Sequence, residues 1–441
     1  MTKRFTLFRR FLFVSLSCLI LLHVGQASQA PRGDAKAAGF SLEKLELIPA
    51  FIKDAVEKKQ IAGASGLIAR HGEIVYVTNV GMQDAEANVP LSEATIFRIA
   101  SMSKPITSIA AMTLIEEGKL SPTDLLSKFV PEFKQMQVLV PAKDGNSYEI
   151  VKAVRDITIH HLLTHTSGIT YRLINKPFVS KMYAEAGVSD GIVETQGTLG
   201  DNVRKIAKLP LVCQPGEAWE YGLNTDVLGH VVEGVSGKSL EEFCRERIFR
   251  PLKMNDTCFV LPKEKQSRLS ALYSMGNDKK IARVGAEPIT AGNFIYSSTY
   301  STREGYSYYS GGAALVSTPG DYFRFCQMML NHGELDGVRV LKAETVDRIT
   351  QNQIGDLQIP FPGAGVFGYG FGILTEKGKE EAKDPAGVGS FSWAGAFGTY
   401  FWVDPKNELI GVFMTQVSPP DFALLLGFKR LTYEAMTATK K

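Results

Sequence analysis

Strand-like runs of apolar residues lie near both ends of this chain. Residues 64–70 and 73–78, joined by His71 and Gly72, predict a β-hairpin. Three runs in the last third predict further strands, at residues 370–374, 399–403 and 409–415. Residues 422–438 have the pattern of a closing helix.

Helical periodicity dominates the middle of the chain. Residues 120–260 contain amphipathic runs broken by turns, and the run at 224–235 ends near Gly237. Residues 263–310 are polar, aromatic and irregular, and another amphipathic run then continues to Leu330. This order predicts an α/β (α+β) fold, in which both ends of the chain build an antiparallel sheet flanked by helices. A mostly helical region, at about residues 120–310, is inserted between them.

The N-terminus has the composition of a targeting segment. Four basic residues lie within the first ten positions, an apolar run covers 11–24, and small residues at Ala27-Ser-Gln-Ala30 suit cleavage. We therefore predict a signal peptide at 1–30, a linker at 31–44 and one hydrolase domain at 45–438. The expected location is periplasmic or secreted, with no stable membrane span after cleavage.

The overall charge gives no reason to expect nucleic-acid binding. The formal net charge of +3 falls to −1 once the four basic residues of the predicted leader are removed. The 441 residues are 44% apolar, which predicts a large globular core. The four cysteines beyond the leader are too few for a disulfide framework, so we expect buried thiols, with any pairing left open. The oligomeric state is not indicated.

The candidate nucleophile is Ser101, which precedes Lys104 by one helical turn at the start of an apolar run. A desolvated lysine can act as a general base for such a serine. The spacing alone is weak, because about two matches are expected by chance in a chain of this length. The second match, Ser41 with Lys44, opens an ordinary amphipathic run, which we interpret as a helix start.

Two later segments could complete a site for acyl transfer. Tyr221 lies on a turn just before a predicted helix, and a tyrosine beside a lysine can shuttle protons. Residues 390–398 are rich in small residues, so their backbone can approach a substrate and offer an amide to an oxyanion. Taken separately, Tyr221 could be ordinary aromatic packing and 390–398 a glycine-rich strand edge.

Together these segments resemble the serine β-lactamase-like superfamily, and most closely the class C β-lactamases, D-Ala-D-Ala peptidases and family VIII carboxylesterases. The resemblance covers about residues 45–435 and rests on ordered motifs. These are Phe97-Arg-Ile-Ala-Ser-Met-Ser-Lys104, Ile157-Thr-Ile-His-His-Leu-Leu-Thr-His-Thr-Ser-Gly168, Gly216-Glu-Ala-Trp-Glu-Tyr-Gly222 and Gly311-Gly-Ala-Ala-Leu-Val-Ser-Thr-Pro-Gly-Asp-Tyr322.

The resemblance implies a role for each matched position. Ser101 would be the nucleophile and Lys104 its base partner, while Tyr221 would activate Ser101 or protonate the leaving group. The amides of Ser101 and Ala396 would form the oxyanion hole. Trp393 and Gly395 occupy the place of the family's third motif, and we expect both to contact the substrate. No cofactor and no metal are implied.

Departures from the family pattern favour an esterase. Trp393 replaces the lysine with which lactamases and peptidases hold a substrate carboxylate. Leu223 stands where those enzymes often have an asparagine, although Asn224 follows and is a candidate substrate contact. Both changes resemble the esterase branch. The expected substrate is a small-molecule ester or amide.

Other readings stay open at this stage. A β-lactamase or D-Ala-D-Ala carboxypeptidase is the alternative within the enzymes, and a catalytically silent cell-wall-binding protein is the alternative of another class. Tyr309 belongs to a tyrosine-rich run that could line a substrate cleft or could be loop packing. His160, His161 and His165 lack the glutamate of a zincin helix, so we expect structural roles for them.

Overall fold

An eight-stranded antiparallel sheet forms the centre of the computed structural model, which describes residues 31–174, 176–361 and 365–437. Its strands run in the order β14 (Val366–Phe367), β15 (Gly372–Ile373), β16 (Phe391–Gly395), β17 (Thr399–Asp404), β18 (Leu409–Met414), β1 (Gly63–Arg70), β2 (Glu73–Asp84) and β3 (Val89–Pro90). Strand β1 pairs with β18 in a register that sets Ser65 opposite Met414 and Arg70 opposite Leu409. The predicted sheet built from both ends of the chain is therefore confirmed.

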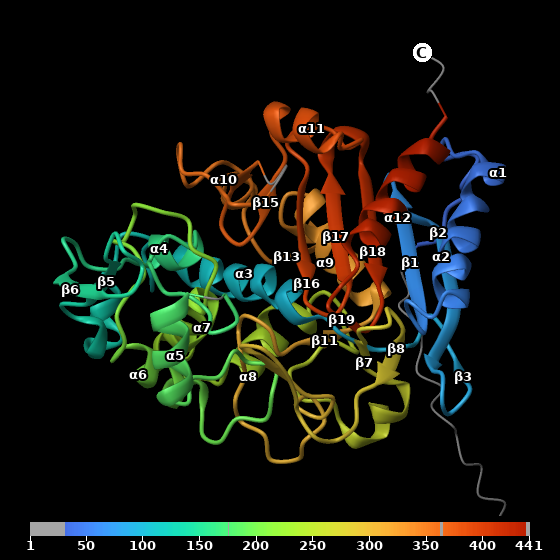
Figure 1. Cartoon of the computed structure of the whole chain (residues 1–441). Helices are drawn as coiled ribbons and strands as arrows, with labels where there is room; N and C mark the ends of the chain where they lie inside the picture. The colour runs from blue at the N-terminus through green and yellow to red at the C-terminus, as the bar shows by residue number, and fades with distance from the viewer. Residues whose placement is uncertain (1–30, 175, 362–364, 438–441) are drawn as a thin grey trace, which may run out of the picture.

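Successive side chains of these strands pack into two cores on opposite faces of the sheet, as the two-residue period of a strand requires. Leu67 and Phe401 join the larger core, while their neighbours Ile68 and Trp402 join the smaller one. The smaller core is covered by α1 (Leu42–Leu45), α2 (Leu47–Glu57) and α12 (Phe422–Ala435) (Figure 1). The larger core contains residues of α3 (Ser103–Glu116) and α9 (Pro319–Leu330).

The inserted region continues the larger core beyond α3. Its helices are α4 (Ile159–Leu163), α5 (Pro177–Glu185), α6 (Leu199–Ile206), α7 (Asn224–Ser236) and α8 (Leu240–Cys244). Short strands accompany them: β5 (Gln137–Pro141), β6 (Tyr148–Lys152), β7 (Tyr273–Met275), β8 (Ile281–Arg283), β9 (Ile289–Ala291) and β10 (Phe294–Tyr296). Helix α3 is buried on almost every side, because it lies between the sheet and this region (Figure 1).

Smaller elements complete the described chain. They are β4 (Phe97–Arg98), β11 (Val316–Ser317), β12 (Glu334–Leu335), β13 (Val338–Arg339), β19 (Val417–Ser418), α10 (Ala343–Ile349) and α11 (Glu376–Ala382). Strand β4 pairs with β11, which ties the segment before Ser101 to the chain that enters α9.

The segment expected to be a linker packs against the domain instead. The amide of Gly33 donates to the carbonyl of Ile74 at 3.0 Å, and the amide of Ser41 donates to that of Ala435 at 2.8 Å. Phe40 is only 2% exposed, so this segment covers part of the smaller core. The reason for the difference is that one buried aromatic, Phe40, anchors a stretch whose other residues are mostly small or polar. The predicted signal peptide lies outside the described residues.

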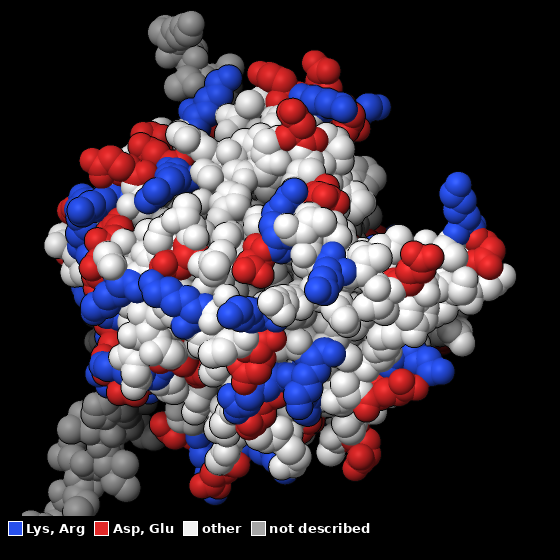
Figure 2. Space-filling model, turned by 90° about the vertical axis from the view of Figure 1, so that its left-hand side faces the viewer, with Lys and Arg blue, Asp and Glu red and all other residues white. Residues whose placement is uncertain are grey.

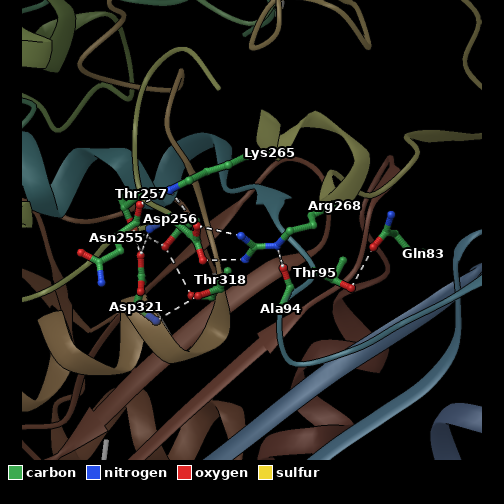
Figure 3. A network of polar contacts seen from close by, with 11 residues as sticks. Gln83, Ala94, Thr95, Asn255, Asp256, Thr257, Lys265, Arg268, Thr318 and Asp321 are labelled. Atoms are coloured by element: carbon green, nitrogen blue, oxygen red, sulfur yellow. Dashed lines mark hydrogen bonds and ion pairs between the residues drawn. The ribbon is translucent and has the colours of Figure 1, made fainter. Parts of the chain in front are cut away.

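A polar network holds the segment before the nucleophile to the inserted region (Figure 3). Arg268 donates to the carbonyl of Ala94 at 2.8 Å and to both carboxylate oxygens of Asp256, at 3.0 and 2.5 Å. The Asp256 amide and the Thr257 hydroxyl then donate to Asp321 in the first turn of α9, at 2.7 and 3.0 Å. The network thus ties three chain segments together.

The surface around the inserted region carries mixed charge. On the face shown in Figure 2, Lys and Arg side chains are interspersed with Asp and Glu over broad uncharged areas. No helix among the described residues combines the length and apolarity needed to cross a membrane. The four described cysteines are free thiols, and Cys244 and Cys326 are buried, as expected of small apolar side chains.

Candidate active site

Ser101 lies on a tight turn that leads directly into α3. Ala100, the residue before it, has φ of +42°, a left-handed conformation that residues with a β-carbon seldom adopt. The Ser103 hydroxyl holds this turn by donating to the Ala100 carbonyl at 2.7 Å and accepting from the Leu315 amide at 3.1 Å. Ser101 is left half-exposed at the end of an otherwise buried helix.

Lys104 follows one helical turn later, as its spacing predicts. Its ammonium donates to the Ser101 hydroxyl oxygen at 3.0 Å and to the Gly312 carbonyl at 2.8 Å. The side chain is only 1% exposed, so the two contacts take the place of water around the amine. The structure therefore brings the predicted nucleophile and its predicted base into direct contact.

Tyr221 is the third member of this group. Lys104 Nζ lies 4.7 Å from the Tyr221 ring centroid and 5.2 Å from that of Tyr171, so the amine faces two aromatic rings. Trp219 stacks on Tyr221 with ring centroids 5.8 Å apart, and the tilted ring of Trp393 has its centroid 5.7 Å from that of Tyr221. This aromatic packing fixes the position of the Tyr221 ring beside Lys104.

Gly312 leaves open a small volume on which three polar groups converge. A β-carbon at this position would lie 2.5 Å from Asp226 Oδ2, 3.0 Å from the Tyr171 hydroxyl and 3.5 Å from Lys104 Nζ. Burial raises the pKa of Asp226 to about 6, although Ser310 and the Lys104 ammonium counteract that shift. An acid is thus buried close to the predicted base.

His165 is a neutral residue whose ring packs against Tyr221. Burial, and next to it the charge of Lys104, hold the pKa of His165 well below its usual range. The neutral ring lies 5.1 Å from the Tyr221 centroid, and its Nδ1 is 3.0 Å from the Asn224 amide nitrogen. His161 closes a capping box with Thr158 at the start of α4. These contacts give the two histidines structural roles, as expected.

The end of β16 is pressed against the turn that carries the nucleophile. A β-carbon on Gly395 would lie 2.3 Å from the Ile99 carbonyl oxygen, so only glycine fits there. The Thr399 hydroxyl donates to the same carbonyl at 3.2 Å. This contact brings Ala396 to the wall of the pocket that also contains Ser101. The placement suits the predicted oxyanion hole.

The pocket over Ser101 has a volume of about 310 Å³ and mostly apolar walls. Its lining consists of Ala100, Ser101, Tyr171, Leu173, Asp190, Ile192, Tyr221, Phe294, Ala313, Ala396, Ser418, Pro419 and Pro420. None of these described lining residues is Lys or Arg. The site can therefore accept an apolar, uncharged ester beside a nucleophile, a base and a tyrosine.

Two predicted substrate contacts lie elsewhere. Asn224 is fully buried, and its side chain is held by the Ser167 hydroxyl at 2.5 Å and by the Ile169 carbonyl at 3.2 Å. Tyr309 packs on Phe259, with centroids 5.7 Å apart, outside the pocket lining. Both residues make packing contacts here, and a substrate contact for either stays a prediction. Trp393 likewise contacts the ring of Tyr221 and is absent from the lining described above.

Three residues of the site were not predicted from the sequence. Tyr171 and Asp190 are on irregular segments of the inserted region, and Asp226 is an ordinary acidic residue in the first turn of α7. Only the folded chain places Asp226 opposite Lys104 and Asp190 beside the nucleophile's pocket. The one usable hint was the position of Tyr171, three residues after the motif that ends at Gly168.

The chain is similar to several known proteins. A family model described as Beta-lactamase matches residues 48–433. Esterase EstB from Burkholderia gladioli is 32% identical over 391 residues, covering 86% of this chain and 93% of EstB. Protein Rv1367c from Mycobacterium tuberculosis is 33% identical over 380 residues, covering 84% and 89%. The structure of EstCE1, described as a hydrolase with promiscuous acyltransferase activity, superposes with a TM-score of 0.78 at 27% identity, covering 89% and 100%.

Proposed function

The chain belongs to the β-lactamase family and is a serine hydrolase, and from this premise we propose that it is an exported esterase that cleaves small carboxylic esters through an acyl-enzyme. The observation that carries the proposal is the contact of 3.0 Å between Lys104 Nζ and Ser101 Oγ at the wall of an apolar pocket. A serine is a weak nucleophile unless an adjacent base takes its proton, and Lys104 is placed for that role.

The proposed reaction has two steps. Ser101 Oγ attacks the ester carbonyl, and its proton passes to the Lys104 and Tyr221 pair. The oxyanion of the tetrahedral intermediate accepts hydrogen bonds from the Ser101 and Ala396 amides. As the C–O bond breaks, the alcohol leaves with a proton from the same pair. Water, deprotonated by that pair, then attacks the acyl-enzyme and releases the acid and Ser101.

The pocket favours an ester over a β-lactam or a peptide. A substrate carboxylate needs a cation or an array of donors, whereas the third motif here contributes Trp393, which packs against Tyr221. The described pocket lining contains no basic residue, so a carboxylate would find no cation there. The similarity to an enzyme named esterase supports the same choice.

Substitution of the nucleophile is the direct test. Ser101→Ala should lower kcat/KM for p-nitrophenyl butyrate by at least about 10³-fold, because the acyl-enzyme can no longer form. Ser41→Ala is a matched control, since Ser41 precedes Lys44 with the same spacing but lies at the start of α1. That control should keep wild-type turnover, and circular dichroism should show both variants folded. Unchanged turnover in Ser101→Ala would refute the proposal.

Substrate comparison separates the esterase from its alternatives. We expect turnover of the butyrate ester to exceed that of nitrocefin and of a D-Ala-D-Ala peptide. A reversed order would favour a lactamase or a peptidase. A fluorophosphonate probe should label the wild-type protein and leave Ser101→Ala unlabelled, whereas no labelling of either would favour a silent binding protein. Export is tested by fractionation, with N-terminal sequencing of the mature protein expected to begin near residue 31.

Acyl transfer to an alcohol is a second candidate for the fate of the acyl-enzyme. The structurally similar EstCE1 is described as having promiscuous acyltransferase activity, and an apolar pocket admits an alcohol as readily as an ester. Product analysis in the presence of an added alcohol distinguishes the two fates. A new ester would indicate transfer, and free acid alone would indicate hydrolysis.

A further inference from the structure

Ser103 is a buried polar residue at the start of α3 for which the proposed reaction has no direct use. It is 0% exposed and is not among the described residues that line the pocket, so it does not touch a substrate there. In the chain it lies between the nucleophile Ser101 and Lys104. A buried hydroxyl is tolerated when it is hydrogen-bonded, and its partners show what this one holds in place.

The two partners of Ser103 fix the direction of its proton. A backbone amide can only donate, so the Leu315 N–H, at 3.1 Å, takes up an acceptor site of the hydroxyl oxygen. The hydroxyl proton is then directed at the other partner, the Ala100 carbonyl oxygen, at 2.7 Å. Leu315 is fixed to the same turn, because its carbonyl accepts from the Ile99 amide at 3.0 Å. The Ala100 carbonyl is therefore held by a hydroxyl that is itself held in place.

The Ala100 carbonyl and the Ser101 amide are the two ends of one trans peptide group. Such a group is planar, and its C=O and N–H point in opposite directions, so a bond that fixes the carbonyl also fixes the N–H. The Ser101 amide donates to no acceptor in the described chain, and both residues line the pocket. The Ser101 N–H is thus available to a ligand, in a direction that Ser103 sets.

This peptide group needs a restraint. The φ of Ala100 is +42°, in the left-handed region that residues with a β-carbon seldom adopt. Relaxation of Ala100 toward an ordinary conformation would rotate the peptide group that follows it and turn the Ser101 N–H. A donor on the carbonyl also polarises the peptide, which makes the N–H at its other end a stronger donor.

We propose that Ser103 is a positioning residue for the oxyanion hole: its hydroxyl aims the Ser101 amide at the oxygen that becomes negatively charged in the transition state. The inference rests on the proposed esterase function and adds to it a residue that makes no hydrogen bond to the Lys104 amine. Because an oxyanion donor must be aligned before the charge develops, losing this alignment should weaken binding of the transition state more than binding of the ester.

Ser103→Ala tests this role, because it removes the hydroxyl and little else. With p-nitrophenyl butyrate, kcat and kcat/KM should fall together by about 10- to 100-fold at nearly constant KM, since complete loss of one oxyanion donor costs about 10²–10³ in kcat. Butylboronic acid becomes a tetrahedral anion when Ser101 Oγ, having given up its proton, bonds to boron. Its Ki should rise by about the same factor as kcat/KM falls. The pH dependence of kcat/KM should keep its wild-type midpoints, because Lys104 and Tyr221 are unchanged.

Thr113→Val is the matched control in the same helix. The Thr113 hydroxyl is 2% exposed and donates at 2.8 Å to the carbonyl of Ala110, three residues earlier, as Ser103 does to Ala100. Valine removes this bond with little change of shape. The control should lose stability in thermal unfolding but keep the kcat, the KM and the butylboronic acid Ki of the wild type. An equal loss of activity in the control would refute a specific role for Ser103.

The possible outcomes separate the role of Ser103 from the proposed function. If the wild type hydrolyses esters and Ser103→Ala keeps its kcat and Ki, the role is refuted and the esterase stands. A fall in kcat without a rise in Ki, or with shifted pH midpoints, would place the effect outside the oxyanion hole and also refutes the role. If the wild type hydrolyses no ester, the esterase itself is refuted. If Ser103→Ala does not fold, Ser103→Cys decides, since a thiol is a weak donor: wild-type kcat and Ki in that variant refute the role.

Discussion

Lys104 shows how one buried amine is accommodated by its neighbours. Its amine is held by the Ser101 hydroxyl and the Gly312 carbonyl and faces the rings of Tyr221 and Tyr171. Asp226 is the acid buried nearby, so the charge balance around the amine includes a carboxyl group. A buried charge is costly unless it is paired and hydrogen-bonded, and these neighbours supply what water would supply elsewhere.

Gly312 offers a test of this arrangement. In Gly312→Ala, the added methyl group would lie 2.5 Å from Asp226 Oδ2 and 3.0 Å from the Tyr171 hydroxyl, so both must move. Displacement of groups around Lys104 should lower kcat/KM for p-nitrophenyl butyrate by about 10- to 100-fold. Steady-state kinetics and thermal unfolding measure the effect.

The control for this change lies in α7. A β-carbon on Gly234 would meet nothing within 4 Å, so Gly234→Ala should leave activity unchanged. It should also raise stability by about 0.5–1 kcal/mol, because alanine is the better helix former. Equal kinetics in Gly312→Ala and the wild type would show that the packing around Lys104 tolerates the methyl group.

At the residue scale, sequence patterns predicted what is local and missed what packing decides. Ser101 and Lys104 meet because one helical turn separates them, and that spacing is visible in the sequence. Asn224 was predicted to contact substrate but is turned into the core, where Ser167 and Ile169 satisfy its amide. Neither its burial nor the approach of Asp226 to Lys104 follows from neighbouring residues.

Among the elements, α9 illustrates how a helix end can anchor other segments. Thr318 caps its first turn by accepting from the Asp321 amide at 3.1 Å, and the Asp321 side chain then accepts from the segment at 256–257 (Figure 3). Asp321 is fully enclosed by these contacts, and burial raises its pKa to about 7.

This shift predicts how stability depends on pH. The carboxyl group of Asp321 titrates near 7 in the folded chain and near 3.9 when unfolded, so its stabilising contribution is complete below pH 3.9 and is lost as pH rises through 7. The asparagine of Asp321→Asn cannot ionise, so the variant does not lose this stability as the pH rises. The unfolding free energy of the variant, relative to wild type, should therefore increase between pH 5 and pH 7 by up to about 1.4 kcal/mol per pH unit. Denaturant titrations at several pH values measure it; a constant difference would contradict it.

Element prediction succeeded where periodicity was clear. The hairpin of β1 and β2 and the strands β15, β17 and β18 are formed where the apolar runs indicated. The residues before position 45 were predicted as a linker because most are small or polar, yet Phe40 buries itself beside α12. A single aromatic residue in a polar stretch shows no periodicity, so the packing of Phe40 beside α12 could not be predicted from the sequence.

At the scale of the whole molecule, the sheet and the inserted region share one core. Leu67 and Phe401 of the sheet, Ile109 of α3, and Leu199 and Val227 of the inserted region belong to one continuous apolar cluster. The candidate active site draws on both parts, since Ser101 and Ala396 border the sheet while Tyr221 belongs to the inserted region.

A shared core predicts cooperative unfolding. Far-UV circular dichroism, tryptophan fluorescence and residual esterase activity should lose their native signals at one denaturant concentration, within error, because the larger core extends through both parts. Trp219 reports on the inserted region, while Trp393 and Trp402 report on the sheet. Loss of activity well before the fluorescence change would indicate that the inserted region unfolds separately.

The pairing of β1 with β18 has a consequence during synthesis. Arg70 of β1 pairs with Leu409 of β18, which lies far later in the chain. Strand β1 therefore emerges from the ribosome long before the strand with which it pairs has been made. At ~5–20 residues per second, the wait is on the order of tens of seconds. Throughout it, the nascent hairpin of β1 and β2 presents an open edge and two apolar faces, a surface prone to aggregation. We expect a holding chaperone to bind this hairpin until the last third of the chain is made.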